Sequence, residues 1–213
     1  MVTANGTDSA AATRALGAAA TLFALGGIAA AVLLDPTFSW TSDALSDLGV
    51  RDRSAPVFNG GLVLGGVAGV GYALGLWRSA AGRGALGAAR AGVLALALLA
   101  LAGVGAFDLT EPLHGPAAIG FYVLVTVAFA VDGVARRASA SGRVVLAFAP
   151  VHVAVWATFA AGWWPVAGLA LPELPGALLL AAWVWALGPL PVLGPVFDSI
   201  GSEAGAAGAG DDA

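Results

Sequence analysis

The chain has 213 residues, of which 59% are hydrophobic and 10% are charged, and its mean hydropathy is +0.89. Soluble domains carry about 25% charged residues, so this composition excludes an ordinary water-soluble fold. With no lysine and no cysteine, the chain cannot form a retinal or pyridoxal-phosphate Schiff base, a disulfide or a thiolate metal site. A net charge of −4 argues against nucleic acid as a partner.

Six stretches of the chain are long and apolar enough to cross a bilayer, which requires roughly 20 mainly apolar residues. Their hydrophobicity is continuous, which favours helices over the alternating strands of a membrane β-barrel. We therefore predict an all-α polytopic membrane protein with six transmembrane helices in one bundle. The predicted spans are residues 15–34, 57–77, 86–107, 116–134, 144–164 and 176–197.

The ends of the chain differ in composition from the apolar part between them. Residues 1–13 and 198–213 are small and polar, and the second segment is also acidic, so we expect both to be disordered tails. Residues 14–197 form the predicted six-helix transmembrane domain. Arg90, inside the third span, is expected to extend its side chain to the membrane interface.

The arginines predict the orientation of the bundle. Under a six-helix count, seven of them flank one side and only Arg51 and Arg53 lie on the other. The positive-inside rule then places both termini in the cytoplasm, with the protein as a multi-pass component of the cell membrane. The opposite face collects carboxylates, and avoidance of lysine together with surface acid resembles the composition of a halophilic archaeon. The seven arginines are Arg14, Arg78, Arg83, Arg90, Arg136, Arg137 and Arg143.

Glycines in the second span recur at four-residue spacing. Such spacing allows two helices to approach backbone to backbone, so it predicts a helix-packing face and offers an interface through which the chain could form an oligomer. A general glycine bias in the composition would explain the same pattern. The glycines are Gly61, Gly65 and Gly69 in one register, and Gly71 and Gly75 in a second.

Two short blocks stand out in the sequence, one at residues 46–49 and 58–59 and one at residues 105–108 and 114. They resemble the domain-of-unknown-function 998 family of small six-helix membrane proteins of archaea and bacteria. The second block, Gly105–Asp108 followed by His114, has Phe-Asp where that family often has Phe-Pro. The resemblance implies a six-helix membrane fold and no known activity. A fainter likeness to autophagy-modulator and lipid-anchor-remodelling membrane proteins points towards lipid handling. The first block comprises Ser46, Asp47, Leu48 and Gly49, followed by Phe58 and Asn59.

The two predicted outer loops carry the side chains best suited to chemistry. Carboxylate oxygens and one imidazole could hold a divalent cation such as calcium, magnesium or zinc, and the candidate ligands are Asp43, Asp47, Asp108, Glu111 and His114. Asp47, Asp108 and His114 could also position a water for attack on a lipid ester, which makes them the candidate catalytic residues. In the alternative interpretation Arg51 and Arg53 neutralise the acids and His114 caps the fourth helix. No cofactor is predicted.

Besides Arg90, a histidine and an aspartate lie within the predicted spans. Intramembrane ionisable residues are functional candidates by default, and His152 in the fifth span is one. We expect it to be neutral and hydrogen-bonded to Tyr122, Thr126 or Thr158, because such side chains commonly bond across membrane helices. Asp132 and Arg136 are four positions apart, which predicts an ion pair near the end of the fourth helix.

Three functions stay open from the sequence. The favoured one is a non-enzymatic bundle that binds, senses or organises membrane lipids. The alternative is a membrane-embedded enzyme acting on lipid head groups at the outer face, and a small-solute transporter is the third. Membrane lipids are the expected partners, and whether the chain is an enzyme stays open.

Overall fold

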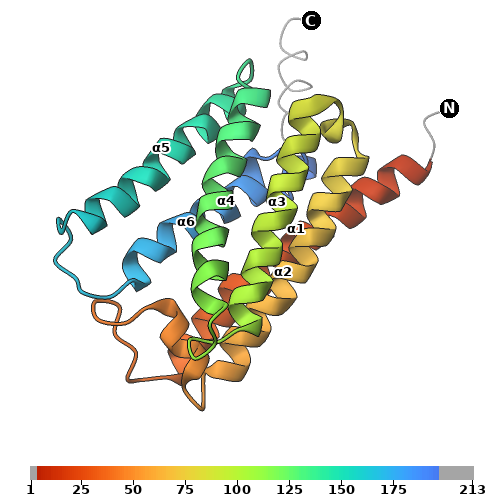
Figure 1. The fold of residues 1–213 in the computed structure, drawn as a ribbon. Coiled ribbons are helices and arrows are strands. Elements are labelled where there is room, and N and C mark those ends of the chain that lie inside the picture. The colour runs from red at the N-terminus through yellow and green to blue at the C-terminus, as the bar shows by residue number, and fades with distance from the viewer. Residues whose placement is uncertain (1–3, 197–213) are drawn as a thin grey trace, which may run out of the picture.

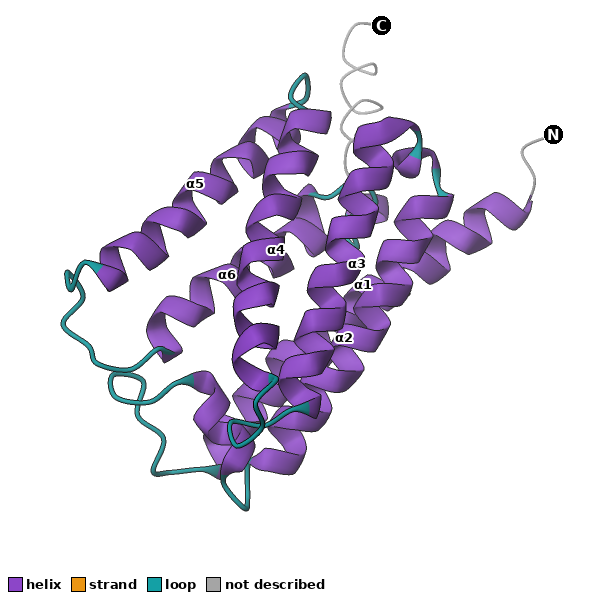
Figure 2. Ribbon diagram, in the orientation of Figure 1, coloured by secondary structure: helices purple, strands orange, loops and turns teal. Residues whose placement is uncertain are grey.

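The computed structural model describes residues 4–196, and Figure 1 shows their helices packed into one bundle. Figure 2 shows only helices and loops for these residues, so the described part of the chain is all-α. Six helices have the length and hydropathy of membrane spans, which confirms the predicted polytopic bundle. The helices are α1 (Ala4–Leu34), η1 (Leu45–Val50), α2 (Ala55–Arg78), η2 (Ala80–Gly82), α3 (Gly84–Ala106), α4 (His114–Ala135), α5 (Ala140–Ala160), α6 (Ala170–Ala182) and η3 (Trp183–Leu187).

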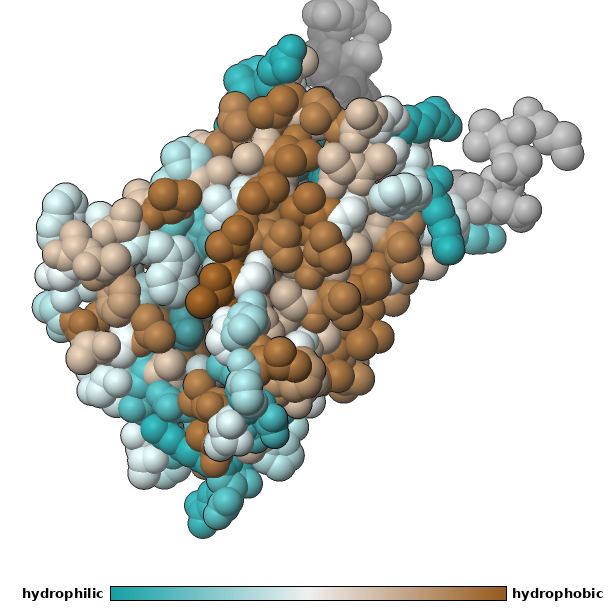
Figure 3. All heavy atoms as spheres, in the orientation of Figure 1, coloured by the Kyte–Doolittle hydropathy of each residue, from teal (hydrophilic) through white to brown (hydrophobic). Residues whose placement is uncertain are grey.

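The helices divide the molecule into two polar ends and an apolar middle. We call the end formed by residues 76–90, 132–143 and 187–196 the terminal end, and the end formed by residues 35–54, 107–113 and 161–169 the loop end. On the face seen in Figure 3, brown apolar side chains cover the middle of the bundle and teal hydrophilic ones gather towards both ends. This is the surface expected of a protein whose middle lies in hydrocarbon.

Helices that follow one another in the chain pack side by side. The most extensive contacts are those of α1 with α2, α2 with α3, α3 with α4 and α4 with α5, as expected where connections are short. The π-helix η3 then returns to α1, where Trp185 Nε1 donates to Thr21 Oγ1 over 2.7 Å. Beyond η3, Arg14 Nε donates to the Pro191 carbonyl over 3.2 Å. These contacts close the bundle.

The glycine face of α2 packs against neighbours in the same chain. A Cβ built on Gly61 would lie 2.7 Å from the Phe23 carbonyl oxygen, and one built on Gly65 would lie 2.9 Å from the Ala20 carbonyl oxygen. Only glycine therefore allows α1 and α2 to approach this closely. The remaining glycines also face helices of the same chain: Gly69 faces Leu98 of α3, and Gly71 and Gly75 face Leu16 and Thr13 of α1.

The first helix begins much earlier than the sequence predicted. Residues 4–13 were expected to be part of a disordered tail, but they form the first turns of α1. Alanine has the highest helix propensity, and the run 10–12 is all alanine. Thr13 is buried, and its hydroxyl bonds the Ser9 carbonyl within the helix over 2.8 Å. The predicted tail at 198–213 lies outside the described residues.

The sixth span also differs from its predicted limits, 176–197. Helix α6 begins at Ala170, and the helical segment ends with η3 at Leu187. The helix contains Pro172 and Pro175, although proline usually interrupts a helix. Pro172 lies in the first turn, where a backbone N–H has no helical partner to lose, so proline is tolerated there.

Replacing Gly65 with leucine should destabilise the bundle. The added side chain has no space against Ala20 and Ala24, and overpacking of this kind costs about 1–3 kcal/mol. Val67→Leu is the matched control, because Val67 is 63% exposed on the same helix. We expect Gly65→Leu to lower the melting temperature in detergent by several degrees more than the control does. Equal melting temperatures would show that α1 and α2 do not depend on close approach.

The arginine distribution predicts that the terminal end faces the cytoplasm, and cysteine labelling tests it. The native chain has no cysteine, and Arg53 and Ala138 are exposed in loops separated by three spans. An impermeant thiol reagent added to intact cells should label Arg53→Cys and should reach Ala138→Cys only after lysis. Labelling of Ala138→Cys alone in intact cells would show that the terminal end faces the exterior, the opposite of the predicted orientation.

Candidate functional site

Two apolar spaces meet inside the bundle. An inner cavity of about 80 Å³ lies among α1, α2, α3, α4 and α6. A larger space of about 600 Å³, which we call the lateral groove, lies between α4, α5 and the start of α6. Figure 1 shows α5 diverging from α4 towards the loop end, with α6 between them. Ala118, Tyr122 and Glu173 border both spaces and form the partition between them.

Glu173 is the polar group at this partition. It lies in the first turn of α6 and is only 8% exposed. One carboxylate oxygen accepts a 2.8 Å hydrogen bond from the Leu45 backbone N–H at the start of η1. Within residues 4–196 the other oxygen and the Tyr122 hydroxyl have no hydrogen-bond partner. The partition therefore offers an acceptor and a hydroxyl to whatever occupies the apolar spaces.

No sequence pattern singled out Glu173. It stood among the acids expected on the outer face, outside both blocks of the family resemblance. Its importance comes from burial, which depends on the packing of α6 against η1, 128 positions away in the chain. A glutamate next to Pro172 at the start of an apolar run is the only local signal that could have indicated it.

His152 is fully buried beside the lateral groove, and its ring has a partner at each nitrogen. Trp156 Nε1 donates to Nε2 over 3.1 Å, and Nδ1 lies 2.8 Å from the Thr126 hydroxyl. Because Nε2 accepts, this pattern assigns the ring proton to Nδ1 and makes the imidazole neutral. The predicted bond to Thr126 is thus confirmed. The close approach of α6 requires Gly176, where a built Cβ would lie 2.5 Å from Nε2.

The residues of the first family block build the short helix η1 and fix it on α2. Leu48 and Phe58 are buried in the loop-end core, and Asn59 Nδ2 donates to the Gly49 carbonyl over 2.9 Å. Gly49 is needed because a Cβ there would lie 2.6 Å from Asn59 Oδ1. Ser46 borders the inner cavity. Most of the block therefore serves the local fold.

The candidate catalytic and metal-binding residues form hydrogen bonds mainly with nearby residues of their own loops. Asp47 accepts the Ala44 backbone N–H over 2.7 Å at the start of η1. Asp108 accepts the backbone and hydroxyl of Thr110 over 2.8 and 2.6 Å, and these bonds lower the pKa of its carboxyl below the usual value. His114 is buried beside the inner cavity, with Nδ1 at 2.7 Å from the Phe107 carbonyl.

These residues do not gather around a common point. Among residues 4–196 no three His, Asp or Glu side chains are close enough to hold a metal ion together, and Glu111 is exposed. No hydrogen bond joins Asp47 to His114 in this part of the chain. His114 is the first residue of α4, and its ring bonds Phe107 and does not cap the helix, contrary to the alternative interpretation.

Arg51 neutralises two acids of the first loop, as the alternative interpretation expected, whereas Arg53 forms no ion pair with a described residue. Its guanidinium donates to Asp35 over 2.7 Å and to Asp43 over 2.8 Å. Hydrogen bonds from Thr37 and Arg51 lower the pKa of Asp35 to about 2, and the bonds from Ser39 and Arg51 lower that of Asp43. Asp43 is thereby committed to the loop structure.

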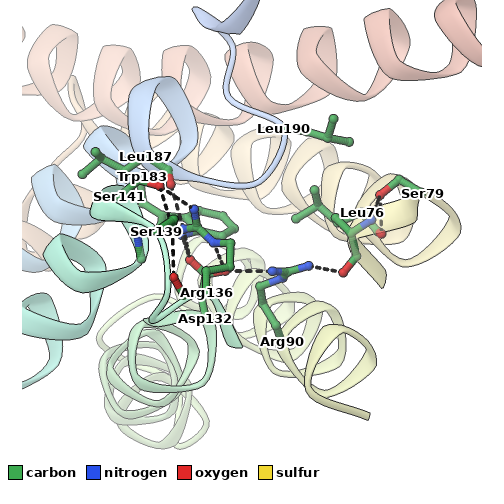
Figure 4. A network of polar contacts seen from close by, with 12 residues as sticks. Leu76, Ser79, Arg90, Asp132, Arg136, Ser139, Ser141, Trp183, Leu187 and Leu190 are labelled. Carbon is green, nitrogen blue, oxygen red and sulfur yellow. Dashed lines mark hydrogen bonds and ion pairs between the residues drawn. The ribbon is translucent and has the colours of Figure 1, made fainter. Parts of the chain in front are cut away.

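A second polar network lies at the terminal end, and Figure 4 shows Asp132 at its centre. Its carboxylate accepts from Arg90 Nη1 over 2.8 Å, from Trp183 Nε1 over 2.7 Å and from two nitrogens of Arg136. The predicted pair of Asp132 with Arg136 is confirmed. The prediction for Arg90 is wrong: its side chain is 2% exposed and does not extend into solvent, because the buried carboxylate of Asp132 holds it inside.

A family model described as a protein of unknown function (DUF998) matches residues 18–189. The chain belongs to the DUF998 family. The match covers all six spans at least in part and includes both blocks identified in the sequence. No curated protein and no solved structure matches the chain. For this DUF998 protein, any statement on activity must therefore come from the arrangement of its own residues.

The loop-end network should make stability fall with acid. The pKa of Asp35 lies below its usual 3.8 in the folded chain, so its contribution is complete above that value and disappears as the pH falls towards about 2. We expect Asp35→Asn to melt below the wild type at about pH 6, and the difference to shrink near pH 2. The control, Asp52→Asn, changes an exposed acid of the same loop. A difference between wild type and Asp35→Asn that is independent of pH would contradict the ion pair.

Proposed function

We propose that this protein is a non-enzymatic lipid-binding protein that holds the hydrocarbon chain of a membrane lipid in its lateral groove. The observation that carries the proposal is an apolar groove between α4, α5 and α6 with a single buried carboxylate at its loop end. Together with the arginine distribution, this makes a lipid of the outer leaflet of the cell membrane the proposed ligand.

The size and lining of the groove suit a hydrocarbon chain. Its volume of about 600 Å³ lies in the range of roughly 300–1,000 Å³ that is usual for ligand sites. Ile119, Val123 and Val153 border the groove and are each more than half exposed at membrane-spanning positions. A lipid chain can therefore enter sideways from the bilayer without crossing a polar surface.

The carboxylate end of the groove suits a lipid whose polar part carries a hydrogen-bond donor. Glu173 is 8% exposed and has one oxygen without a hydrogen-bond partner among the described residues, so this oxygen is available to a ligand. A hydroxyl or an amine of the ligand would bond this oxygen while its chain fills the groove. Glu173 lies in the first turn of α6, close to the polar loops, which is the level of lipid head groups.

Binding accounts for this geometry better than catalysis does. A hydrolytic mechanism needs a nucleophile or water held by a general base within hydrogen-bond reach. Ser46, His114 and Glu173 all border the inner cavity, yet none of them is hydrogen-bonded to another within residues 4–196. His114 Nδ1 is occupied by the Phe107 carbonyl. Binding of a lipid needs only the apolar lateral groove and the free oxygen of Glu173 as a hydrogen-bond acceptor.

Filling the groove should remove the lipid. Val153→Trp places an indole in the groove, whereas Val151→Trp places the same group on the same helix outside it, and both positions are at least 50% exposed. We expect lipid to co-purify with the wild type and with Val151→Trp, and most of it to be lost from Val153→Trp. Native mass spectrometry of mildly extracted protein measures the bound lipid. Equal retention by both variants would eliminate the groove as the site.

A further inference from the structure

A third space lies at the terminal end, far from the lateral groove along the bundle. It has a volume of about 410 Å³ and lies where the first turn of α3 meets the end of α4 and Pro189. Three arginines from separate positions border it: Arg83, Arg90 and Arg136. No acid borders this space, which we call the arginine pocket.

The first turn of α3 contributes backbone donors to the arginine pocket. The residues from Gly84 to Gly87 all line it, and α3 has no side-chain cap and no acid in its first turn. The backbone N–H groups of Gly84, Ala85 and Leu86 have no hydrogen-bond partner within the described chain. A helix N-terminus carries a partial positive charge and binds anions through such groups.

Arg90 gives a second and independent indication of an anion. Its side chain is 2% exposed, with Nη1 on Asp132 and Nη2 on the Ala81 carbonyl. Its Nε is buried and has no partner within residues 4–196. An unpaired donor on a buried cation is costly, and Arg90 is among the residues that border the pocket.

The charges of the arginine pocket do not balance. Asp132 is shared between Arg90 and Arg136, which leaves one positive charge in that network. Arg83 is exposed and has no ion pair in the described chain, so it adds a second. The guanidinium groups of these arginines and the free backbone N–H groups of α3 provide several hydrogen-bond donors, which suits the several acceptor oxygens of a phosphate group.

We propose that the arginine pocket binds the phosphate group of an anionic ligand. The phosphate belongs either to the head group of an anionic phospholipid at this end of the bundle or to a free phosphate compound. The pocket lies where α3 and α4 reach the membrane surface, and exposed Leu86 on its rim offers an apolar contact beside the head group. Basic pockets between helices at such positions are suited to anionic lipid head groups.

Thermal melting of the full chain in detergent tests the proposal. Phosphatidylglycerol, phosphatidylcholine and inorganic phosphate are added separately at matched ionic strength. A ligand at about 100 times its dissociation constant should raise the melting temperature of a chain of this size by roughly 5 °C or more. We expect that rise with phosphatidylglycerol and none with phosphatidylcholine. A similar rise with inorganic phosphate would assign the site to free phosphate compounds. A rise with phosphatidylglycerol but none with inorganic phosphate would assign the site to the lipid.

Two variants and a matched control separate the site from general charge effects. Ala85→Asp places a carboxylate on the free helix N-terminus, which should leave the fold intact because an acid there is favourable, but should repel the ligand. Arg83→Ala removes an exposed cation from the pocket, and Arg78→Ala removes one from the same end outside it.

We expect the ligand-induced rise to be retained in Arg78→Ala, reduced in Arg83→Ala and lost in Ala85→Asp. The Ala85→Asp chain should melt, without ligand, no lower than the wild type. A rise that survives in Ala85→Asp, or the absence of any rise in the wild type with both phosphatidylglycerol and inorganic phosphate, would overturn the proposal.

Discussion

A carboxylate buried in an apolar bundle must be neutralised, and the packing at the terminal end follows from that requirement. Asp132 is fully buried, and its donors come from α3, from α4 itself and from η3. Removing one partner of a buried ion pair typically costs about 3–5 kcal/mol, so these three elements are held at fixed separations. Arg136 also donates to the Leu187 carbonyl over 2.7 Å and to the Ser141 hydroxyl over 3.0 Å, which ties in the start of α5.

Helix α5 is held firmly at the terminal end but stands apart from α6 at the loop end. Helix α5 is bound to the network where it begins, but along its length it packs mainly on α4 and makes few contacts with α6. It contains Pro150, which has no N–H to continue the helical bonding. The space that results between α4, α5 and α6 is the lateral groove. A bundle anchored by charge at one end can thus leave room for a ligand at the other without losing its fold.

The sequence predicted the features that depend on local pattern. The six spans follow from continuous hydrophobic length, and the pair of Asp132 with Arg136 follows from a spacing of four residues on a helix. Arg90 was misjudged because its partner lies 42 positions away, and nothing in its neighbourhood indicates a buried acid. Glu173 was missed for the same reason, since its burial depends on how α6 meets the first loop.

The first and sixth helices begin earlier than their local sequences predict. Helix α6 begins six residues before its predicted limit and contains Pro172 and Pro175, of which only Pro172 lies in the first turn, where a helix loses little from proline. Residues 4–13 looked too polar for ordered structure, yet helix propensity and the buried Thr13 extend α1 through them. Tertiary contacts decide both cases, and a single sequence does not reveal those contacts.

The return of η3 to α1 has a consequence for how the chain assembles. The bond from Trp185 to Thr21 joins residues 164 positions apart, and Trp183 supplies a donor to Asp132 from the same short segment. During synthesis the earlier helices are complete before this segment appears. Until then the flank of α1 is uncovered and the buried acid lacks one of its donors. The bundle therefore closes only with the last span, and the loss of a few residues there would disturb helices made at the very beginning.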